Sequence, residues 1–119
     1  MLVRNKRDCA SSHIATFDPQ RSLARRYLPR SRAIESICKT YVRYMAIENW
    51  ISDNLDVQTI QYDDFIASPL EHTLRLCDWA GFVFDSTQNK SLYRARTLRS
   101  KWDKLDDEAK LVIDSFFPE

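Results

Sequence analysis

The sequence predicts an α/β chain that is mostly helical and contains about two short strands. Apolar residues recur at helical spacing over 34–50, which predicts a long amphipathic helix over about 32–53 with Ser31 as its N-cap. Residues 56–62 alternate apolar with polar side chains, which predicts a strand of about five or six residues. The apolar pair at 2–3 supplies the other strand. Two strands make a poor sheet, so we expect a fragment of a larger α/β sandwich.

A shorter helix is predicted before the long one, over about Lys6–Phe17. The dipeptide Asp18-Pro19 ends it, because proline cannot continue a helix and restricts the residue before it. Residues 18–31 hold two prolines and four arginines, which predicts a loop with at most one short helical turn.

Two further helices are predicted after the second strand. Ser68 is expected to be the N-cap of the first, with Pro69 at its first position and Glu71 completing a capping box. This helix is expected to end near Gly81, since glycine favours the position after a helix. Acidic residues over 106–108 predict the start of the last helix. Its apolar residues are Ala109, Val112, Ile113 and Phe116.

Length and composition indicate a single globular domain over residues 1–119. Hydrophobic residues make up 44% of the chain and aromatic residues 12%, which is typical of a folded protein. No apolar run approaches the roughly 18 residues of a membrane span, and no signal-peptide pattern is present. We therefore expect a soluble, cytoplasmic chain with no membrane contact.

The cysteines and histidines do not predict a metal site. Cys9, Cys38 and Cys77 are far apart and form no CxxC motif, so buried free thiols are favoured over disulfides or metal ligands. His13 and His72 are too few and too isolated to form a ligand set.

The net charge of +1 hides four blocks of alternating sign. Residues 1–32 hold eight Lys/Arg against two Asp, and 33–89 hold three against nine acids. Residues 90–104 are again basic, and 105–119 are acidic. The two basic blocks could converge on one anion, whereas the acidic blocks oppose a broad nucleic-acid footprint. No nucleic-acid partner is therefore predicted.

Loop arginines are the one feature that suggests RNA binding. Tyr27 is the only aromatic residue beside the arginines at positions 21, 25, 26, 30 and 32. A solvated loop, or a lid over an acceptor, is the favoured interpretation.

The first residues carry a phosphate-binding pattern. Arg4 ends the first strand and Ser12 follows eight residues later on a helix, so a guanidinium and a hydroxyl are available to one phosphate. The chain has a single glycine, Gly81, which excludes a glycine-rich phosphate loop.

Three motifs in order resemble the C-terminal half of sulfotransferases that use 3′-phosphoadenosine 5′-phosphosulfate (PAPS). The first is Arg4-Asn5-Lys6-Arg7-Asp8 with Ser12, where Lys6 replaces the usual proline. The second is Tyr62-Asp63-Asp64-Phe65, followed by Pro69, a helix and Gly81. The third is a basic cluster with a Trp before the last helix, here Arg94, Arg96 and Trp102 to Glu108, without the usual glycines.

The resemblance implies a partial P-loop-like sulfotransferase sandwich and a set of cofactor-binding residues. In that family the Arg and Ser of the first motif bind the 3′-phosphate and the Tyr lies beside the adenine. Arg4, Ser12 and Tyr62 therefore inherit those roles, and Arg94 or Arg96 could reach the same phosphate. No catalytic residue is assigned.

Each of these residues also has a structural interpretation. Arg4 could be a solvated strand-end charge, Ser12 a surface serine, and Tyr62 a core tyrosine. Asp63 and Asp64 resemble a catalytic pair but are expected to bond backbone N–H groups of the next turn. Aromatic side chains at four other positions are expected in the core or against the rest of a larger sandwich: Trp50, Trp79, Phe116 and Phe117.

Together these features predict a truncated sulfotransferase-family chain that keeps the 3′-phosphoadenosine side of a PAPS site. The parent activity is transfer of a sulfuryl group from PAPS to a hydroxyl or amine, and the isolated chain is expected to be inactive. The alternative is a non-enzymatic helical interaction module that self-associates or pairs with a separately encoded front half through its incomplete sheet.

Overall fold

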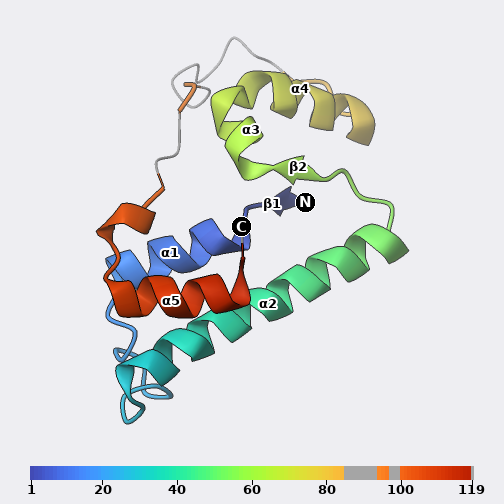
Figure 1. The fold of residues 1–119 in the computed structure, drawn as a ribbon. Coiled ribbons are helices and arrows are strands. Elements are labelled where there is room, and N and C mark those ends of the chain that lie inside the picture. Colours follow the sequence, from blue (N-terminus) through green and yellow to red (C-terminus); the bar gives the residue numbers. More distant parts are fainter. Residues whose placement is uncertain (85–93, 97–99, 119) are drawn as a thin grey trace. The chain divides into compact units, whose positions relative to one another are not determined.

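The computed structural model describes residues 1–84, 94–96 and 100–118, which divide into two compact units. The strand unit comprises Met1–Arg4 and Leu55–Arg99, and the helix unit comprises Asn5–Asn54 and Ser100–Glu119. The described residues are mostly helical with two parallel strands (Figure 1), which confirms the predicted α/β class at that level. Within them, no helix combines the length and apolar character that a membrane span needs.

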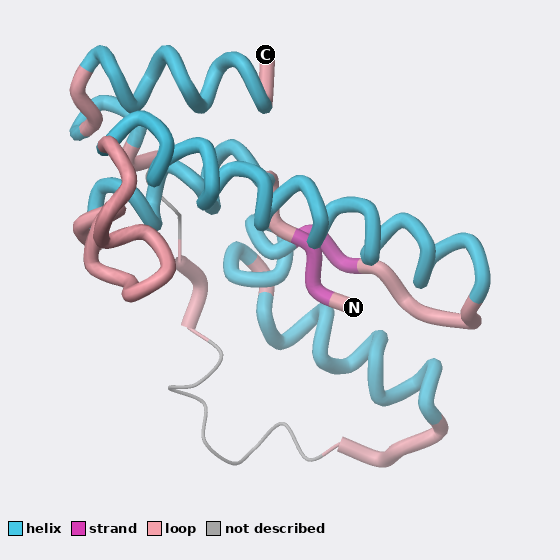
Figure 2. Tube along the Cα trace, turned by 90° about the horizontal axis from the view of Figure 1, so that it is seen from below, coloured by secondary structure: helices cyan, strands magenta, loops and turns pink. Residues whose placement is uncertain are grey.

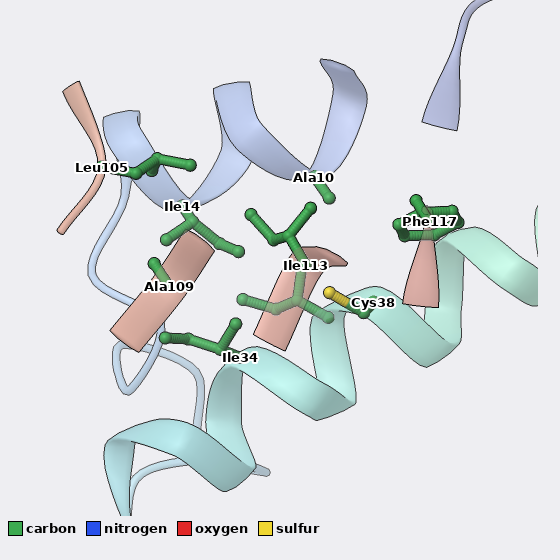
Figure 3. Packing of buried hydrophobic residues seen from close by; sticks show 9 residues of the cluster. Ala10, Ile14, Ile34, Cys38, Leu105, Ala109, Ile113 and Phe117 are labelled. Carbon is green, nitrogen blue, oxygen red and sulfur yellow. The ribbon is translucent and has the colours of Figure 1, made fainter. Parts of the chain in front are cut away.

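Helices α1 (Lys6–Thr16), α2 (Arg30–Asn54) and α5 (Asp107–Phe116), with the short 3₁₀ helix η2 (Trp102–Lys104), form the helix unit. Helices α1 and α5 both pack on the N-terminal part of α2 and on each other (Figure 1). Their apolar faces meet in one core, shown in Figure 3. It contains Ala10, Ile14, Ile34, Ile37, Cys38, Leu105, Ala109, Ile113 and Phe117.

The ends of these helices confirm the predicted start of α5 and correct the predicted N-cap of α2. Acidic residues lie at the start of α5 as predicted, and Asp106 accepts a hydrogen bond from the Ala109 N–H at 2.9 Å. Helix α2 begins at Arg30, so the predicted Ser31 N-cap is wrong. The Pro29 carbonyl accepts the first helical bond, from the Ala33 N–H. Proline fits there because its fixed φ and missing N–H cost nothing at a helix start.

Strands β1 (Leu2–Val3) and β2 (Ile60–Gln61) pair in parallel in the strand unit (Figure 2, magenta). The predicted strand over 56–62 is therefore too long, and Tyr62 already begins helix α3 (Tyr62–Ala67). A strand lasts only where a partner pairs with it, and β1 offers two residues. Acidic residues after Tyr62 favour a first helical turn there.

Helix α4 (Pro69–Ala80) begins and ends at the predicted residues. Pro69 is at its start, and Gly81 after its end has φ 78°, the left-handed conformation that glycine adopts most easily. The predicted capping box is wrong, because the Ser68 side chain makes no capping hydrogen bond. Ser68 also ends α3, where its N–H donates to the Asp64 carbonyl, and this sets its backbone conformation.

All three cysteines are free, as predicted, but only Cys38 is buried. Burial and the nearby Glu35 carboxylate raise the pKa of the Cys38 thiol to about 11. Cys9 and Cys77 are half-buried.

The four aromatic residues divide between core and surface. Phe117 is buried, and Phe116 packs against the core. Trp50 is 57% exposed and Trp79 is 51% exposed.

Candidate nucleotide site

Arg4 and Tyr62 lie together where the two parallel strands end. Val3 pairs with Gln61, so the next residue on each strand, Arg4 and Tyr62, leaves the same edge of the sheet. The Arg4 guanidinium carbon lies 5.9 Å from the centre of the Tyr62 ring. The structure therefore brings together two of the five residues that the sequence predicts for the site.

This contact suits both side chains to an anionic, ring-bearing ligand. Both residues are half-buried, and the guanidinium lies over the ring in a cation–π arrangement. A guanidinium offers a rigid fork of N–H donors that matches a phosphate or sulfate group. The phenol ring adds an apolar face on which a base can pack. The pair can thus contact a phosphate and a ring of one molecule.

A third predicted segment belongs to the same unit. The Arg96 N–H donates to the Ile66 carbonyl at 2.7 Å, which ties residues 94–96 to helix α3. Tyr62 is the first residue of that helix. Arg94 and Arg96 are both exposed. Residues 94–96, which are hydrogen-bonded to the helix that begins with Tyr62, therefore carry two more cations.

Ser12 belongs to the other unit. It is half-buried on α1, one residue after the buried Ser11, whose hydroxyl donates to the Arg7 carbonyl at 2.8 Å. Because Arg4 belongs to the strand unit and Ser12 to the helix unit, their pairing on one phosphate stays a prediction.

Arg7, from the same sequence motif, has a structural role within the helix unit. Its guanidinium pairs with the Asp114 carboxylate at 2.6 Å and donates to the Phe117 carbonyl at 3.1 Å. The guanidinium carbon also lies 3.9 Å from the Trp102 ring centre. Trp102, the aromatic residue of the third motif, therefore serves this contact. Sequence reasoning missed it because the partners lie about a hundred residues away.

A second polar feature of the strand unit was not predicted. A cavity of about 230 Å³ is lined by β2 and the residues around it together with Asp64 of α3 and His72 and Arg75 of α4. Asp64 was expected only to bond backbone groups, yet it is one of the residues that line this cavity. The sequence spacing of these lining residues did not predict the cavity, because the cavity forms only when α4 folds beside β2.

Among the described residues, no group of His, Cys, Asp or Glu is arranged to hold a metal ion. A scan against protein-family models finds no match to this chain, and searches of the curated proteins and of the solved structures find no similar protein. The sulfotransferase resemblance therefore depends on the three motifs.

Proposed function

We propose that the strand unit binds the 3′-phosphoadenosine part of a nucleotide, in the manner of a PAPS-using sulfotransferase. The juxtaposition of Arg4 and Tyr62 at the ends of β1 and β2 is the observation that carries this proposal. In open α/β sheets, ligands bind outside the carboxyl ends of parallel strands, and both residues are at such ends.

The chemistry of the pair assigns each residue a part of the nucleotide. Arg4 keeps its positive charge at every physiological pH and can bind a phosphate through two N–H groups. Tyr62 packs against the adenine. The exposed Arg94 and Arg96 of the same unit add positive potential. These roles follow the family resemblance residue by residue.

The parent reaction moves a sulfuryl group from PAPS to a hydroxyl or amine and releases adenosine 3′,5′-bisphosphate. We assign no catalytic base or acid in this chain, so the proposal concerns nucleotide binding.

Titration with two nucleotides tests the proposal. Adenosine 3′,5′-bisphosphate should bind more tightly than adenosine 5′-monophosphate, because only the former carries the 3′-phosphate. Arg4→Ala should weaken bisphosphate binding by about tenfold or more, since a hydrogen bond to a charged group contributes roughly 1.5–3 kcal/mol. Isothermal titration calorimetry measures both affinities. Equal affinity of the intact chain for the two nucleotides would refute the site.

Matched variants separate the site from general charge effects. Arg75→Ala removes an exposed arginine of the same unit, paired with Glu71, and should leave the affinity within about twofold. Tyr62→Phe should keep the stacking ring and the affinity, while Tyr62→Ala should lose both. Far-UV circular dichroism of each variant identifies any that has lost its helices.

A further inference from the structure

A groove with a basic lining runs along the outer side of α2, within the helix unit. It has a volume of about 380 Å³ and is lined mainly by Leu28, Arg32, Ser36, Lys39, Thr40 and Arg43. Leu28 belongs to the loop that precedes α2, and the others belong to the first half of that helix.

Helical spacing explains why these cations share one face. Arg32, Lys39 and Arg43 are seven and four residues apart, which returns each to the same side of an α-helix. The opposite side of α2 carries the buried Ala33, Ile34, Ile37 and Cys38, against which α1 and α5 pack (Figure 1). The cations extend over about 16 Å of helix at 1.5 Å per residue. That length fits a row of anionic groups better than a single one.

The groove keeps an excess of positive charge. Glu35 also lines it, and its carboxylate pairs with the Arg32 guanidinium at 2.9 Å. In the part of the chain that the structure describes, Lys39 and Arg43 make no ion pair. Glu48 is on the inner side of α2, where it pairs with Lys6 at 2.6 Å. The groove lining therefore holds three cations against one carboxylate.

Exposed aromatic residues flank this row of cations. Tyr27 is 89% exposed and directly precedes Leu28 of the groove. Trp50 is 57% exposed and follows Arg43 by seven residues, about two helical turns, so it returns to the same face. Cations that follow a phosphate backbone, with aromatic rings on which bases stack, are the two components of single-strand binding sites.

We propose that this groove binds single-stranded nucleic acid, with phosphates on Lys39 and Arg43 and bases stacked on Tyr27 and Trp50. From sequence, Tyr27 was the only aromatic residue near the loop arginines and the acidic blocks opposed such binding. The helix adds Trp50 and turns Glu48 away from the groove. This site belongs to the helix unit and does not depend on the nucleotide site of the strand unit.

Fluorescence anisotropy with a labelled oligouridine of about 15 nucleotides tests the proposal at low salt. The wild-type chain should bind, and Lys39→Glu with Arg43→Glu should bind about tenfold more weakly or worse. Lys104→Glu, an exposed charge reversal elsewhere in the same unit, should change the affinity by less than about twofold. The milder Lys39→Gln with Arg43→Gln should lower the salt slope by about 0.7 per lost phosphate contact.

Aromatic variants separate base stacking from charge attraction. Tyr27→Ala should weaken binding by about fivefold or more, and Tyr27→Phe should restore it, because the ring face carries the stacking. A labelled polyglutamate peptide of equal charge should bind at least about tenfold more weakly than the oligonucleotide. Absence of oligonucleotide binding, equal binding of the peptide, or an equal loss in Lys104→Glu would each overturn the proposal.

Discussion

At the scale of single residues, the contact of Arg4 with Tyr62 depends on the register in which the two-residue strands β1 and β2 pair. A shift of one position would move each side chain to the other face of its strand. The short pairing is supported by the main chain beyond β1, where the Ile60 N–H donates to the Met1 carbonyl at 2.9 Å. Arg4 is therefore positioned by backbone hydrogen bonds rather than by its own contacts alone.

His13 is a second residue whose surroundings have a measurable consequence. Its Nδ1 lies 3.1 Å from the Tyr41 hydroxyl, and its ring meets the edges of the Phe17 and Tyr41 rings. Burial, and then the positive charge of Arg25, lower the pKa of His13 below 6.5. The folded chain therefore protonates this imidazole less readily than the unfolded chain does.

We predict that the helix unit loses stability as the pH falls below about 6.5. In that range the unfolded chain binds more protons at His13 than the folded chain does, so acid favours unfolding. Urea unfolding followed by far-UV circular dichroism at several pH values between about 5 and 7.5 measures the slope.

His13→Gln should reduce this slope because glutamine does not titrate. The same slope in this variant as in the wild-type chain would contradict the assignment to His13.

At the scale of elements, the start of α5 depends on one carboxylate. Asp106 caps the helix through the Ala109 N–H and pairs with the Arg30 guanidinium at 2.9 Å. The hydrogen bond from Ala109, and then the bond and charge of Arg30, lower the pKa of Asp106. Stability from this carboxylate is therefore present above the pKa of an unfolded aspartate and lost as the pH falls through the lower folded value.

Asp106→Ala should lower the free energy of unfolding by about 1 kcal/mol, since alanine cannot cap a helix. Asp106→Asn keeps a capping oxygen and loses only the exposed pair with Arg30, so it should cost less than about 0.5 kcal/mol. Urea denaturation at neutral pH measures both. Asp103→Ala, an exposed aspartate of η2, is the control and should stay within about 0.5 kcal/mol of wild type. If Asp106→Asn lowered the free energy of unfolding as much as Asp106→Ala does, the charge of Asp106 and not its capping hydrogen bond would account for the loss.

Elements also show which sequence patterns were sufficient. The extents of α1, α2 and α4 and the start of α5 agree with the predictions to within about two residues, because each helix depends on bonds between residues four apart. Ser31 and Ser68 were wrongly predicted as side-chain caps. Whether a side chain caps a helix depends on the backbone conformation of the segment before it. Pro29 sets that conformation before α2, and the end of α3 sets it before α4.

At the scale of the whole molecule, each unit is built from segments that are distant in sequence. The strand unit joins the first four residues to 55–99, and the helix unit joins 5–54 to the last twenty. The proposed nucleotide site and the proposed nucleic-acid groove fall in different units. Long-range closure of this kind costs chain entropy before any contact repays it, so both units depend on well-packed contacts.

Nucleotide binding should stabilise the strand unit measurably. Trp79 is the only tryptophan of that unit, so a variant with Trp50→Phe and Trp102→Phe reports on it by fluorescence. At a concentration of adenosine 3′,5′-bisphosphate one hundred times its dissociation constant, the strand unit should gain about 2.7 kcal/mol and a higher unfolding midpoint. Adenosine 5′-monophosphate at the same concentration should raise the midpoint less. Introducing Arg4→Ala into this variant should abolish the difference in unfolding midpoint between the two nucleotides. If the difference remained in Arg4→Ala, Arg4 would not be the phosphate ligand.

The sequence by itself determined the mostly helical α/β class, the four longer helices, the acidic start of α5 and the glycine after α4. These features depend on neighbours within about a helical turn, so local composition is sufficient. Only the tertiary structure decided that β2 has two residues, that Arg4 meets Tyr62, and that Arg7 is held by Asp114 and Trp102. Each of these pairs residues far apart in the chain, and no local pattern specifies which distant partner a side chain meets.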